Sequence, residues 1–517
     1  MITNSDARER ARFEHLKNEI SSNGQLMYAG TLLQYAAQKY DDTPALIYQD
    51  KTISFRDLYL YACQLSTMLQ KHGIQSGDRV VIWLENSPEF FIGYYGAWQV
   101  GAVVVPLNIF LTEHELGYIL KDAQPKVIIT SADRVELIKQ LSIESVPQII
   151  TERDMALDQA PQESWRLHQL ITLPENDMSA LLYTSGTTGL PKGVMLSSKN
   201  IMTSLIQTLA RLHLNHGERV FAILPLFHAF AQNAFVWGAI FAGVTIILAP
   251  KIERRYILEG LKHKPTLFLG VPALYGLLCM MKTAPLDSVK LFVSGGDAMP
   301  DKIRSYFELL YHRKICSGYG LTETSPTLSV AFDDEAIPTG NVGTLLPGIQ
   351  ASVRDEQGNE VPRGHIGQLW VKGDNVMLGY YNAPDMTEKA LQDGWFDTGD
   401  LVYFDEKNRL VITGRVKDLI IHKGLNIYPQ EIENVILMHP NVIRVGVIGK
   451  HENAVGEVPV AFVQLRKAEE DIEQKLIRLC KEHLAAYKVP KQFICSTEEL
   501  PVTATAKVDK KVLRKRI

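Results

Sequence analysis

The chain has 517 residues, of which 46% are hydrophobic and 22% are charged, and its formal net charge is −4 at pH 7. A chain of this length is too long for one hydrophobic core, so we expect at least two domains. Because nucleic-acid-binding domains are usually strongly basic, the nearly balanced charge argues against nucleic acid as a partner.

Cysteine usage and the N-terminal residues indicate a cellular compartment. The 5 cysteines lie far apart, without a CxxC pair or a histidine at zinc-finger spacing. An odd, scattered set predicts a reducing compartment and argues against a disulfide framework or a structural metal. Residues 1–20 mix acidic and basic residues and lack an apolar stretch, so we expect no signal peptide and a cytoplasmic location.

Apolar runs of strand length alternate along the chain with stretches of helix length. Runs that are apolar on both faces and separated by helices predict parallel sheets covered by helices. From about Val353 the strands become shorter and turns more frequent, which predicts a small β-rich subdomain. The predicted strands of the large sheets are Arg79–Leu84, Ala102–Leu107, Lys126–Thr130, Met178–Tyr183, Val220–Leu224, Val244–Leu248, Thr266–Gly270 and Lys290–Val293.

An uncharged segment in the middle of the chain, Ala234–Pro250, is similar to a membrane span. However, Gly238 and Gly243 interrupt it, and it ends in the β-branched run Val244–Ile247. A membrane-spanning helix needs about 20 apolar residues. We therefore predict a buried helix followed by a buried strand, with at most peripheral membrane contact.

The last hundred or so residues read as a separate α+β unit. Two strands, Val442–Gly449 and Val458–Leu465, precede an amphipathic helix predicted over Ala468 to Tyr487. Because no floppy linker precedes this unit, we expect it to rotate between set positions. The predicted α/β fold is a large N-terminal domain of helix-covered sheets with the β-rich subdomain (residues 1–416), followed by a small mobile α+β lid domain (417–517).

The loop Tyr183–Gly193 reads Tyr-Thr-Ser-Gly-Thr-Thr-Gly-Leu-Pro-Lys-Gly and follows a predicted strand. Glycines let backbone N–H groups approach an anion closely, hydroxyls add donors and a lysine adds charge, so the loop suits phosphate. It is not the Walker sequence GxxxxGK[ST], and from its composition alone an ordinary turn is the alternative. Its candidate binding residues are Thr184, Ser185, Gly186, Thr187, Thr188, Gly189 and Lys192.

The complete loop and further motifs in the same order resemble the adenylate-forming superfamily, which groups acyl-CoA synthetases, adenylation domains of peptide synthetases and luciferases. The resemblance implies that ATP converts a carboxylic acid to an acyl adenylate, from which the acyl group passes to a thiol. The further motifs are Leu224–His228, Ser294–Asp297, Gly318–Pro326, Asp393–Asp400, Gly414–Asp418 and Pro501–Lys507.

The resemblance implies a nucleotide pocket. Tyr319 is expected to lie against the adenine, Glu323 to bind Mg²⁺ and Asp400, assisted by Arg415, to bind the ribose hydroxyls. A hard carboxylate suits a hard cation that bridges phosphate oxygens. Without the resemblance, Tyr319 would read as a core residue, Glu323 as a surface acid and Arg415 as half of a structural salt bridge. The remaining expected nucleotide-binding residues are Gly295, Asp297, Gly320 and Thr322.

The resemblance also implies two catalytic residues in addition to Lys192, namely His228 and Lys507. His228 is expected to gate and orient the substrate carboxylate, although a lone histidine between apolar neighbours is otherwise a core residue. Lys507 is expected to hold the carboxylate and the α-phosphate together. The alternative for Lys507 is a solvated basic tail or a surface attracted to anionic lipid. Ala506 departs from the glycine usual in the family, which leaves the conformation of this loop in question.

The second step is expected to need a rotation of the lid. The resemblance implies a hinge at Lys417, withdrawal of Lys507 from the site, and a path for the pantetheine of coenzyme A beside Lys423 and Gly424. Free coenzyme A is the expected acceptor, and a separate acyl carrier protein is the alternative. The oligomeric state is left open by the sequence.

The substrate acid is expected to be apolar. Amino-acid-activating relatives carry an aspartate next to the position of His228, whereas the neighbours here are Phe227 and Ala229. An apolar wall suits an acyl chain, so a medium- or long-chain fatty acid is the first prediction and an aryl acid the second. The predicted acyl pocket comprises Phe227, His228, Gln232, Trp237, Gly270 and Gly320.

Two hypotheses from other functional classes, a binding protein and a transporter, have less support. A protein that kept the fold but only binds acyl-AMP need not retain Lys192, Glu323, Asp400, Arg415 and Lys507, which are all present. A membrane-anchored transporter would require Ala234–Pro250 to face lipid. The sequence therefore favours a fatty acid–CoA ligase.

Overall fold

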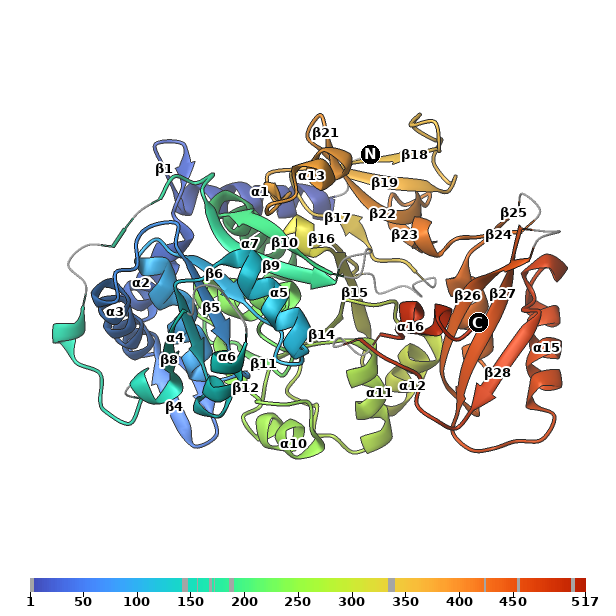
Figure 1. Cartoon of the computed structure of the whole chain (residues 1–517), viewed down its shortest axis with the longest axis horizontal. Coiled ribbons are helices and arrows are strands. Elements are labelled where there is room, and N and C mark those ends of the chain that lie inside the picture. The colour runs from blue at the N-terminus through green and yellow to red at the C-terminus, as the bar shows by residue number, and fades with distance from the viewer. Residues whose placement is uncertain are drawn as a thin grey trace.

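The structure, a computed structural model of the whole chain, describes residues 4–141, 147–155, 157–166, 170–171, 173–185, 190–332, 340–422, 425–452, 456–503 and 507–517. Two large sheets and their helices form the N-terminal part, and the C-terminal residues form a separate lobe, which lies on the right in Figure 1. The smaller antiparallel sheet coloured orange lies at the top of this view.

The first large sheet has seven strands. Its inner strands pair in parallel, as the apolar runs predict, whereas β10 and β20 are antiparallel additions at one edge. In spatial order the strands are β20 (Gly379–Tyr380), β10 (Pro191–Ser197), β9 (Met178–Ser185), β6 (Val103–Pro106), β5 (Arg79–Trp83), β7 (Val127–Thr130) and β8 (Gln148–Thr151).

The second large sheet has nine strands, and six consecutive ones pair in parallel. Antiparallel strands complete both of its edges. In spatial order they are β17 (Thr344–Leu345), β16 (Thr327–Val330), β15 (Ile315–Gly320), β14 (Leu291–Ser294), β13 (Leu267–Gly270), β11 (Arg219–Ala222), β12 (Thr245–Leu248), β3 (Pro44–Tyr48) and β4 (Lys51–Ser54).

Helices fill the space between the large sheets and cover their outer faces. The main core joins strands of both sheets to α2 (Leu32–Tyr40), α3 (Phe55–Lys71), α4 (Pro88–Gln99) and α7 (Ser198–Leu212). A second core places α10 (Arg254–Lys262), α11 (Pro272–Met281) and α12 (Asp301–Tyr311) on the nine-stranded sheet. A third places α5 (Glu113–Ala123) and α6 (Val135–Gln140) on the seven-stranded sheet. The prediction of helix-covered sheets is confirmed.

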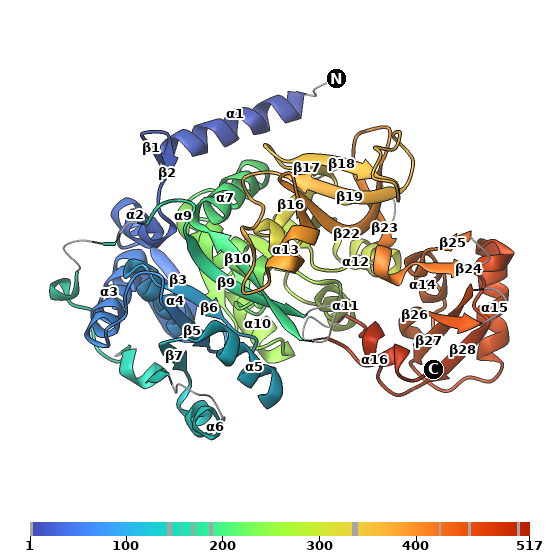
Figure 2. The same cartoon turned by 45° about the horizontal axis from the view of Figure 1, so that its top comes forward.

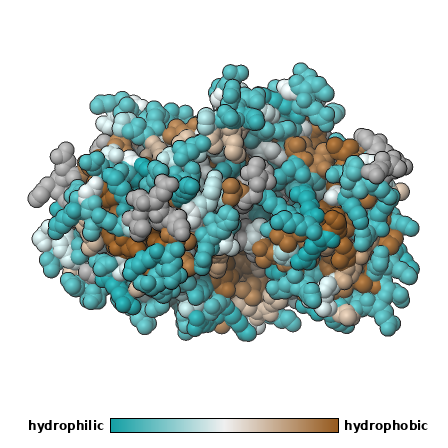
Figure 3. Space-filling model, viewed as in Figure 1, coloured by the Kyte–Doolittle hydropathy of each residue, from teal (hydrophilic) through white to brown (hydrophobic). Residues whose placement is uncertain are grey.

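The uncharged segment is buried in the main core. After α8 (Ala229–Ala231), the segment begins within the π-helix η5 (Gln232–Ala239) and continues through α9 (Ile240–Ala242), and the chain then enters β12. This is the buried helix and strand that the two glycines predict. No helix among the described residues combines the length and the apolar character that a membrane crossing needs. Hydrophilic residues cover most of the face that Figure 3 shows, with hydrophobic ones in separate patches.

A row of polar side chains on α7 holds β16 of the nine-stranded sheet and two connecting segments, one before β18 (Gln350–Arg354) and one before β20. Asn200 donates to the carbonyl of Val376, Gln207 to that of Pro347 and Arg211 to that of Val330. Their spacing puts them on one face of the helix. Glu9 of α1 (Asn4–Glu19), the helix that runs along the top in Figure 2, completes the row through an ion pair of 2.7 Å with Arg211.

The β-rich subdomain is an antiparallel sheet, as predicted from about Val353 onward. One short helix, α13 (Pro384–Ala390), follows β20. The strands of the subdomain are β18 (Gln350–Arg354), β19 (Gly367–Lys372), β22 (Trp395–Phe404), β21 (Leu391–Gln392) and β23 (Leu410–Arg415).

The C-terminal lobe has its own buried cores, which draw only on residues from Ile420 onward. The position of the domain boundary after residue 416 stays a prediction. The lobe contains β24 (Ile420–His422), β25 (Leu425–Ile427), α14 (Pro429–Leu437), β26 (Val442–Glu452), β27 (Gly456–Leu465), α15 (Ile472–His483), β28 (Gln492–Ser496) and α16 (Lys510–Arg514).

The amphipathic helix of the lobe is shorter than the sequence predicts. Instead of Ala468 to Tyr487 it covers Ile472–His483. Asp471 adopts a left-handed conformation with φ of 58°, which α-helical residues do not share, and Leu484 is extended. The stripe of apolar side chains therefore extends beyond the end of the helix, to the extended residue Leu484.

Candidate active site

The predicted site residues follow the carboxyl ends of neighbouring parallel strands. In open α/β sheets, ligands bind at this edge because the loops that leave the strands converge there. The segment that carries His228 follows β11, Gly270 ends β13, and Tyr319 lies near the end of β15. Gly295 and Asp297 follow β14 directly, with Gly295 buried and Asp297 exposed.

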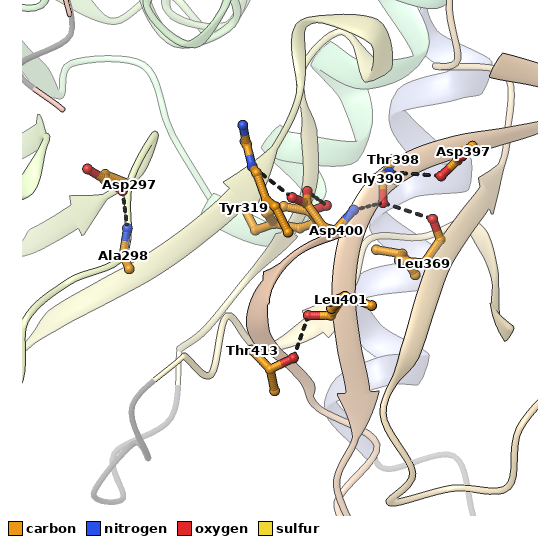
Figure 4. Close-up of polar contacts among 11 residues, drawn as sticks. Asp297, Ala298, Tyr319, Leu369, Asp397, Thr398, Gly399, Asp400, Leu401 and Thr413 are labelled. Carbon is orange, nitrogen blue, oxygen red and sulfur yellow. Dashed lines mark hydrogen bonds and ion pairs between the residues drawn. The ribbon is translucent and has the colours of Figure 1, made fainter. Parts of the chain in front are cut away.

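Tyr319 and Arg415 both contact the carboxylate of Asp400. The hydroxyl of Tyr319 donates to Oδ2 of Asp400 at 2.6 Å, and Nε of Arg415 lies 3.0 Å from Oδ1. Figure 4 shows the tyrosine and the carboxylate facing each other across β15 and β22. The Asp400 side chain is only 3% exposed, whereas that of Arg415 is 45% exposed. The structure thus brings together three residues predicted for the adenosine end.

Burial raises the pKa of Asp400, and the positive charge of Arg415 opposes this shift. The same ion pair raises the pKa of Arg415, with burial acting against it. Burial, and then the charge of Asp400, raise the pKa of Tyr319. The phenol therefore stays protonated at neutral pH and serves as a donor.

The turn before Asp400 fixes the direction of its carboxylate. The backbone N–H of Asp400 donates to the hydroxyl of Thr398, which donates in turn to the carbonyl of Leu369 (Figure 4). Gly399 has φ of 68°, a conformation that glycine adopts without steric cost. Its N–H donates to the carboxylate of Asp397 at 2.8 Å. Sequence reasoning missed Thr398 and Asp397 as positioning residues, although both belong to the quoted motif.

The predicted phosphate loop joins two paired strands. β9 and β10 are antiparallel, and Thr184 lies opposite Lys192. The hydroxyl of Thr184 is buried and has no hydrogen-bond partner among the described residues, which leaves it free to donate to a phosphate oxygen. Gly186, Thr187, Thr188 and Gly189 lie outside the described residues, and Ser185 is described only as the end of β9.

Lys192 contacts Glu323 and an unpredicted partner, Tyr380. Its Nζ lies 3.0 Å from Oε1 of Glu323 and 2.6 Å from the hydroxyl of Tyr380, which donates to the same Oε1 at 2.9 Å. Burial, and then the charge of Glu323, raise the pKa of Tyr380. Tyr380 comes from β20, more than 180 residues after Lys192, so only the edge pairing of the sheet reveals the contact.

The carboxylate of Glu323 suits a cation that takes most of its other ligands from phosphate oxygens and water. It lies beside Thr322 in a short 3₁₀ helix (Thr322–Thr324), and its side chain is 10% exposed. The described residues contain no group of three acidic, histidine or cysteine side chains that could hold a metal. Magnesium commonly takes one or two carboxylates and completes its shell with phosphate oxygens and water, so a single carboxylate at the phosphate end fits that cation.

His228 is neutral and presents one ring nitrogen as a donor. Its Nδ1 accepts from the backbone N–H of Phe230 at 3.2 Å. Burial, followed by the positive charge of Lys507, lowers the pKa of His228 to about 4. A neutral imidazole whose Nδ1 accepts must carry its proton on Nε2. The ring can therefore donate to a carboxylate or phosphate oxygen without introducing a charge.

Lys507 lies within the site although it belongs to the C-terminal lobe. Burial lowers its pKa, Asp297 opposes this shift, Arg415 adds to it and Asp400 opposes it. These groups and His228 are close enough for their charges to act on one another. The backbone of Lys507 is held by a 2.7 Å hydrogen bond from Thr503 N–H to its carbonyl. The structure thus brings this lysine to the nucleotide residues, and Ala506 lies outside the described residues.

The link between the lobes passes through the predicted hinge. Lys417 lies in a 3₁₀ turn (Val416–Asp418) directly after β23, and its carbonyl is 3.5 Å from the guanidinium of Arg514. Lys302 of α12 donates to the carbonyl of His439 at 3.1 Å, which connects the N-terminal part to the lobe. The two residues predicted for the path of coenzyme A, Lys423 and Gly424, lie outside the described residues.

The residues predicted for the acyl pocket take different positions. Phe227 is half-buried beside His228. Gln232 and Trp237 are fully buried and both contact the hydroxyl of Tyr94, at 2.8 and 3.2 Å. Their contribution to an acyl pocket stays a prediction.

Two glycines of the predicted acyl pocket also have packing reasons for being small. A Cβ at Gly320 would lie 1.9 Å from the carbonyl oxygen of Pro326, so no other residue fits there. One at Gly270 would lie 3.1 Å from the ring of Tyr275. Because the neighbouring backbone requires glycine at position 320, its small size there is no sign of a ligand.

The sequence matches a known enzyme family along most of its length. The profile of the AMP-binding enzyme family matches residues 33–381, and that of the AMP-binding enzyme C-terminal domain matches residues 431–507. The long-chain-fatty-acid–CoA ligase of Bacillus subtilis (strain 168) is 35% identical, over 94% of this chain and 93% of that protein. The 4-coumarate–CoA ligase 1 of Petroselinum crispum is 33% identical, over 90% and 89% of the two chains.

A solved structure agrees with the fold. The ATP-bound MatB from Rhodopseudomonas palustris is 32% identical and has a TM-score of 0.87, covering 95% of this chain and 99% of that one. The family match extends over both lobes, since the two family models match residues 33–381 and 431–507. The chain therefore belongs to the AMP-binding enzyme family, and it is an adenylate-forming acyl-CoA synthetase.

Proposed function

We propose that the protein converts a medium- or long-chain fatty acid to its acyl adenylate and then to acyl-CoA. The observation that carries the first step is the position of Lys507, whose charge acts on His228 and Asp400. A lysine from the C-terminal lobe thus completes a site built by the N-terminal sheets. This is the arrangement expected for adenylate formation rather than for thiol attack.

In the first step a carboxylate oxygen of the acid attacks the α-phosphorus of ATP. The new bond joins the acid to AMP, and the bond to pyrophosphate breaks, so no protein nucleophile is needed. The chain supplies positioning and charge: Asp400 and Tyr319 hold the adenosine end, and Lys192 lies at the phosphate end. Lys507 neutralises charge between carboxylate and α-phosphate, and Nε2–H of His228 orients an oxygen.

The phosphate end also supports magnesium, with Glu323 as the carboxylate that would hold it. When bound, this cation supplies charge neutralisation for the departing pyrophosphate. Lys192 must leave Glu323 to reach the phosphates, since its ammonium lies 3.0 Å from that carboxylate.

In the second step the thiol of coenzyme A attacks the acyl carbonyl, a thioester forms and AMP leaves. Lys507 occupies the site in the present arrangement, so it must withdraw before a thiol can approach. Rotation of the lobe about Lys417 accomplishes this, because Lys507 belongs to the lobe that rotates. Lys423 and Gly424 are the residues proposed to line the entry path.

The surroundings of His228 support an apolar acid. Phe227 and Ala229 flank it in the sequence, and Phe230 packs against Gly295, where a Cβ would lie 3.3 Å from the phenyl ring. The described residues next to His228 in the chain thus offer no carboxylate to pair with a substrate ammonium. An apolar wall favours a hydrocarbon chain or ring over a charged side chain.

An aryl acid such as a cinnamate is the second candidate, favoured by the 33% identity with 4-coumarate–CoA ligase 1. An acyl carrier protein is the alternative thiol donor. None of the five cysteines, all of which lie among the described residues, forms a disulfide, which supports the proposal of a reducing, cytoplasmic compartment.

Pyrophosphate exchange with a panel of acids tests the proposal. The panel contains fatty acids of increasing length, a benzoate, a cinnamate and amino acids, and mass analysis then identifies the products formed with coenzyme A or carrier protein. We expect the fastest exchange with fatty acids and an acyl-CoA product. Preference for a cinnamate would replace the fatty acid by the second candidate, and no exchange with any acid would refute acid activation.

A further inference from the structure

Three side chains from three separate elements meet at the phosphate end of the site. Lys192 comes from β10, Glu323 from the 3₁₀ turn after β15, and Tyr380 from β20. The side chain of Glu323 is 10% exposed and that of Lys192 is 22% exposed, while Tyr380 is 5% exposed. The contacts therefore form in a largely desolvated environment, where charge-assisted hydrogen bonds are strong.

The register of the sheet accounts for the meeting of Lys192 and Tyr380. Val194 of β10 lies directly opposite Tyr380 of β20 in an antiparallel pair. Lys192 precedes Val194 by two residues, so its side chain projects from the same face of the sheet. Lys192 and Tyr380 are therefore diagonal cross-strand neighbours. The ammonium also lies 4.0 Å from the centre of the tyrosine ring.

A backbone hydrogen bond also fixes Glu323 beside Lys192 and Tyr380. The N–H of Met377 donates to the carbonyl of Glu323 at 2.9 Å, and Met377 lies three residues before Tyr380. The segment that leads into β20 thus holds both the backbone of the glutamate and, through Tyr380, its carboxylate.

The hydroxyl of Tyr380 has one proton, and the geometry assigns it. The hydroxyl donates to Oε1 of Glu323 at 2.9 Å, and its oxygen accepts from Nζ of Lys192 at 2.6 Å. An ammonium has three donors that rotate freely, so Lys192 can turn to another acceptor. The bond from Tyr380 to Glu323 uses the hydroxyl proton, whereas the bond from Lys192 uses an ammonium proton, so movement of the lysine does not itself break the first bond.

We propose that Tyr380 is a positioning residue for the ATP phosphates and their divalent cation. Without ligand, its hydroxyl is hydrogen-bonded to both members of the ion pair of Lys192 and Glu323. When ATP arrives with its cation, Lys192 turns to the phosphates, and Tyr380 keeps the carboxylate of Glu323 aimed at the cation. This inference rests on the proposed function only in taking ATP with a divalent cation as the ligand.

Binding measured by calorimetry on the full-length protein tests the role without any acid substrate. In Tyr380→Phe the ring is kept and the hydroxyl is lost. Loss of a hydrogen bond to a charged group costs roughly 1.5–3 kcal/mol, so we expect the Kd for ATP with magnesium to rise about tenfold or more. The Kd for AMP, which lacks the β- and γ-phosphates, should change less than about twofold. Tyr381→Phe, the matched control on the next residue, should change neither.

A second pair of variants shows whether Tyr380 acts through Glu323. Glu323→Gln alone should weaken binding of ATP with magnesium, and adding Tyr380→Phe should weaken it little further, because the two changes disturb one contact. Additive losses would contradict the positioning role. Tyr380→His, which keeps one ring donor and one ring acceptor, should lose less affinity than Tyr380→Phe, and it gives the same ligand comparison if Tyr380→Phe does not fold.

Equal weakening of AMP and ATP in a folded Tyr380 variant would show a structural role and overturn the inference, as would unchanged binding of both ligands. The proposed function fails by a different result, namely absence of pyrophosphate exchange with every acid in the wild-type protein. A selective loss of ATP affinity in Tyr380→Phe would stand even then.

Discussion

Lys507 lies close enough to His228 for its positive charge to lower the pKa of the imidazole. The histidine follows a strand of the nine-stranded sheet, whereas the lysine belongs to the C-terminal lobe. Their proximity means that the lobe is docked with its lysine in the site. We propose that both groups act where a substrate carboxylate and the α-phosphate of ATP meet, His228 as a neutral donor and Lys507 as a cation.

Asp400 is predicted to recognise the ribose. Because its buried carboxylate accepts from Tyr319 and pairs with Arg415, a ribose hydroxyl has a fixed acceptor to bind. We expect Asp400→Asn to weaken ATP binding about tenfold or more and to reduce the preference for ATP over 2′- or 3′-deoxy-ATP, as measured by calorimetry. Asp405→Asn, which changes an aspartate paired with Arg409, is the control. If Asp400→Asn kept the full preference, the ribose would be bound elsewhere.

His228 is predicted to stay neutral in mildly acidic solution. Its pKa is about 4 in the folded protein and about 6.5 in an unfolded chain, so the folded state resists protonation between these values. Stability therefore falls as pH decreases from about 6.5 toward 4, where the unfolded chain binds the extra proton. Carbon-13 NMR of the ring, assigned by the signal missing in His228→Gln, should show a neutral ring at pH 5.5. A midpoint near 6.5 would contradict a desolvated position of the ring close to the charge of Lys507.

In Lys507→Ala the same NMR titration should move to higher pH, because one of the two causes of the low pKa is removed. The midpoint should still lie below 6.5, since burial is the larger cause. An unchanged midpoint would mean that the lysine is not close to the ring in solution.

Lys417 is predicted to be the hinge of the second step. Proline at this position fixes φ near −65° and so restricts rotation of the lobe. We expect Lys417→Pro to keep pyrophosphate exchange within a few fold and to slow thioester formation by on the order of a hundredfold. Lys417→Ala removes the ammonium but leaves the backbone free, and it should resemble the wild type in both assays. Normal thioester synthesis by Lys417→Pro would exclude a hinge at this residue.

The architecture was largely predictable because apolar runs report burial directly. Val220–Leu224 and Val244–Leu248 predicted β11 and β12 within about two residues, since buried parallel strands are apolar on both faces. Antiparallel edge strands such as β20 were not predicted, because a strand of two residues, Gly379–Tyr380, has no periodicity to detect. The end of α15 was wrong for a related reason, as its apolar stripe continues into extended chain.

Site residues could be predicted from the sequence where they lie in motifs. They could not be predicted where only the fold brings them together. Tyr319 and Asp400 were expected in one pocket because each lies in a recognisable motif, and the structure shows their side chains in contact. Tyr380 was missed, since its contact with Lys192 depends on which strands become neighbours. Gly320 is a residue that the sequence suggested for the wrong reason. It was predicted for the acyl pocket, whereas the structure shows that the carbonyl of Pro326 leaves no room for a side chain there.

The central claim, that Lys507 serves adenylate formation and then withdraws, is tested most directly by separating the two half-reactions of Lys507→Ala. Removal of a charge that stabilises the transferring phosphoryl group should slow pyrophosphate exchange by about a hundred- to a thousandfold. Conversion of preformed acyl adenylate to thioester in a single turnover should stay within a few fold of wild type. Lys515→Ala, an exposed lysine of the same tail, should change neither rate. Equal loss of both half-reactions in Lys507→Ala, or no loss in either, would contradict the account.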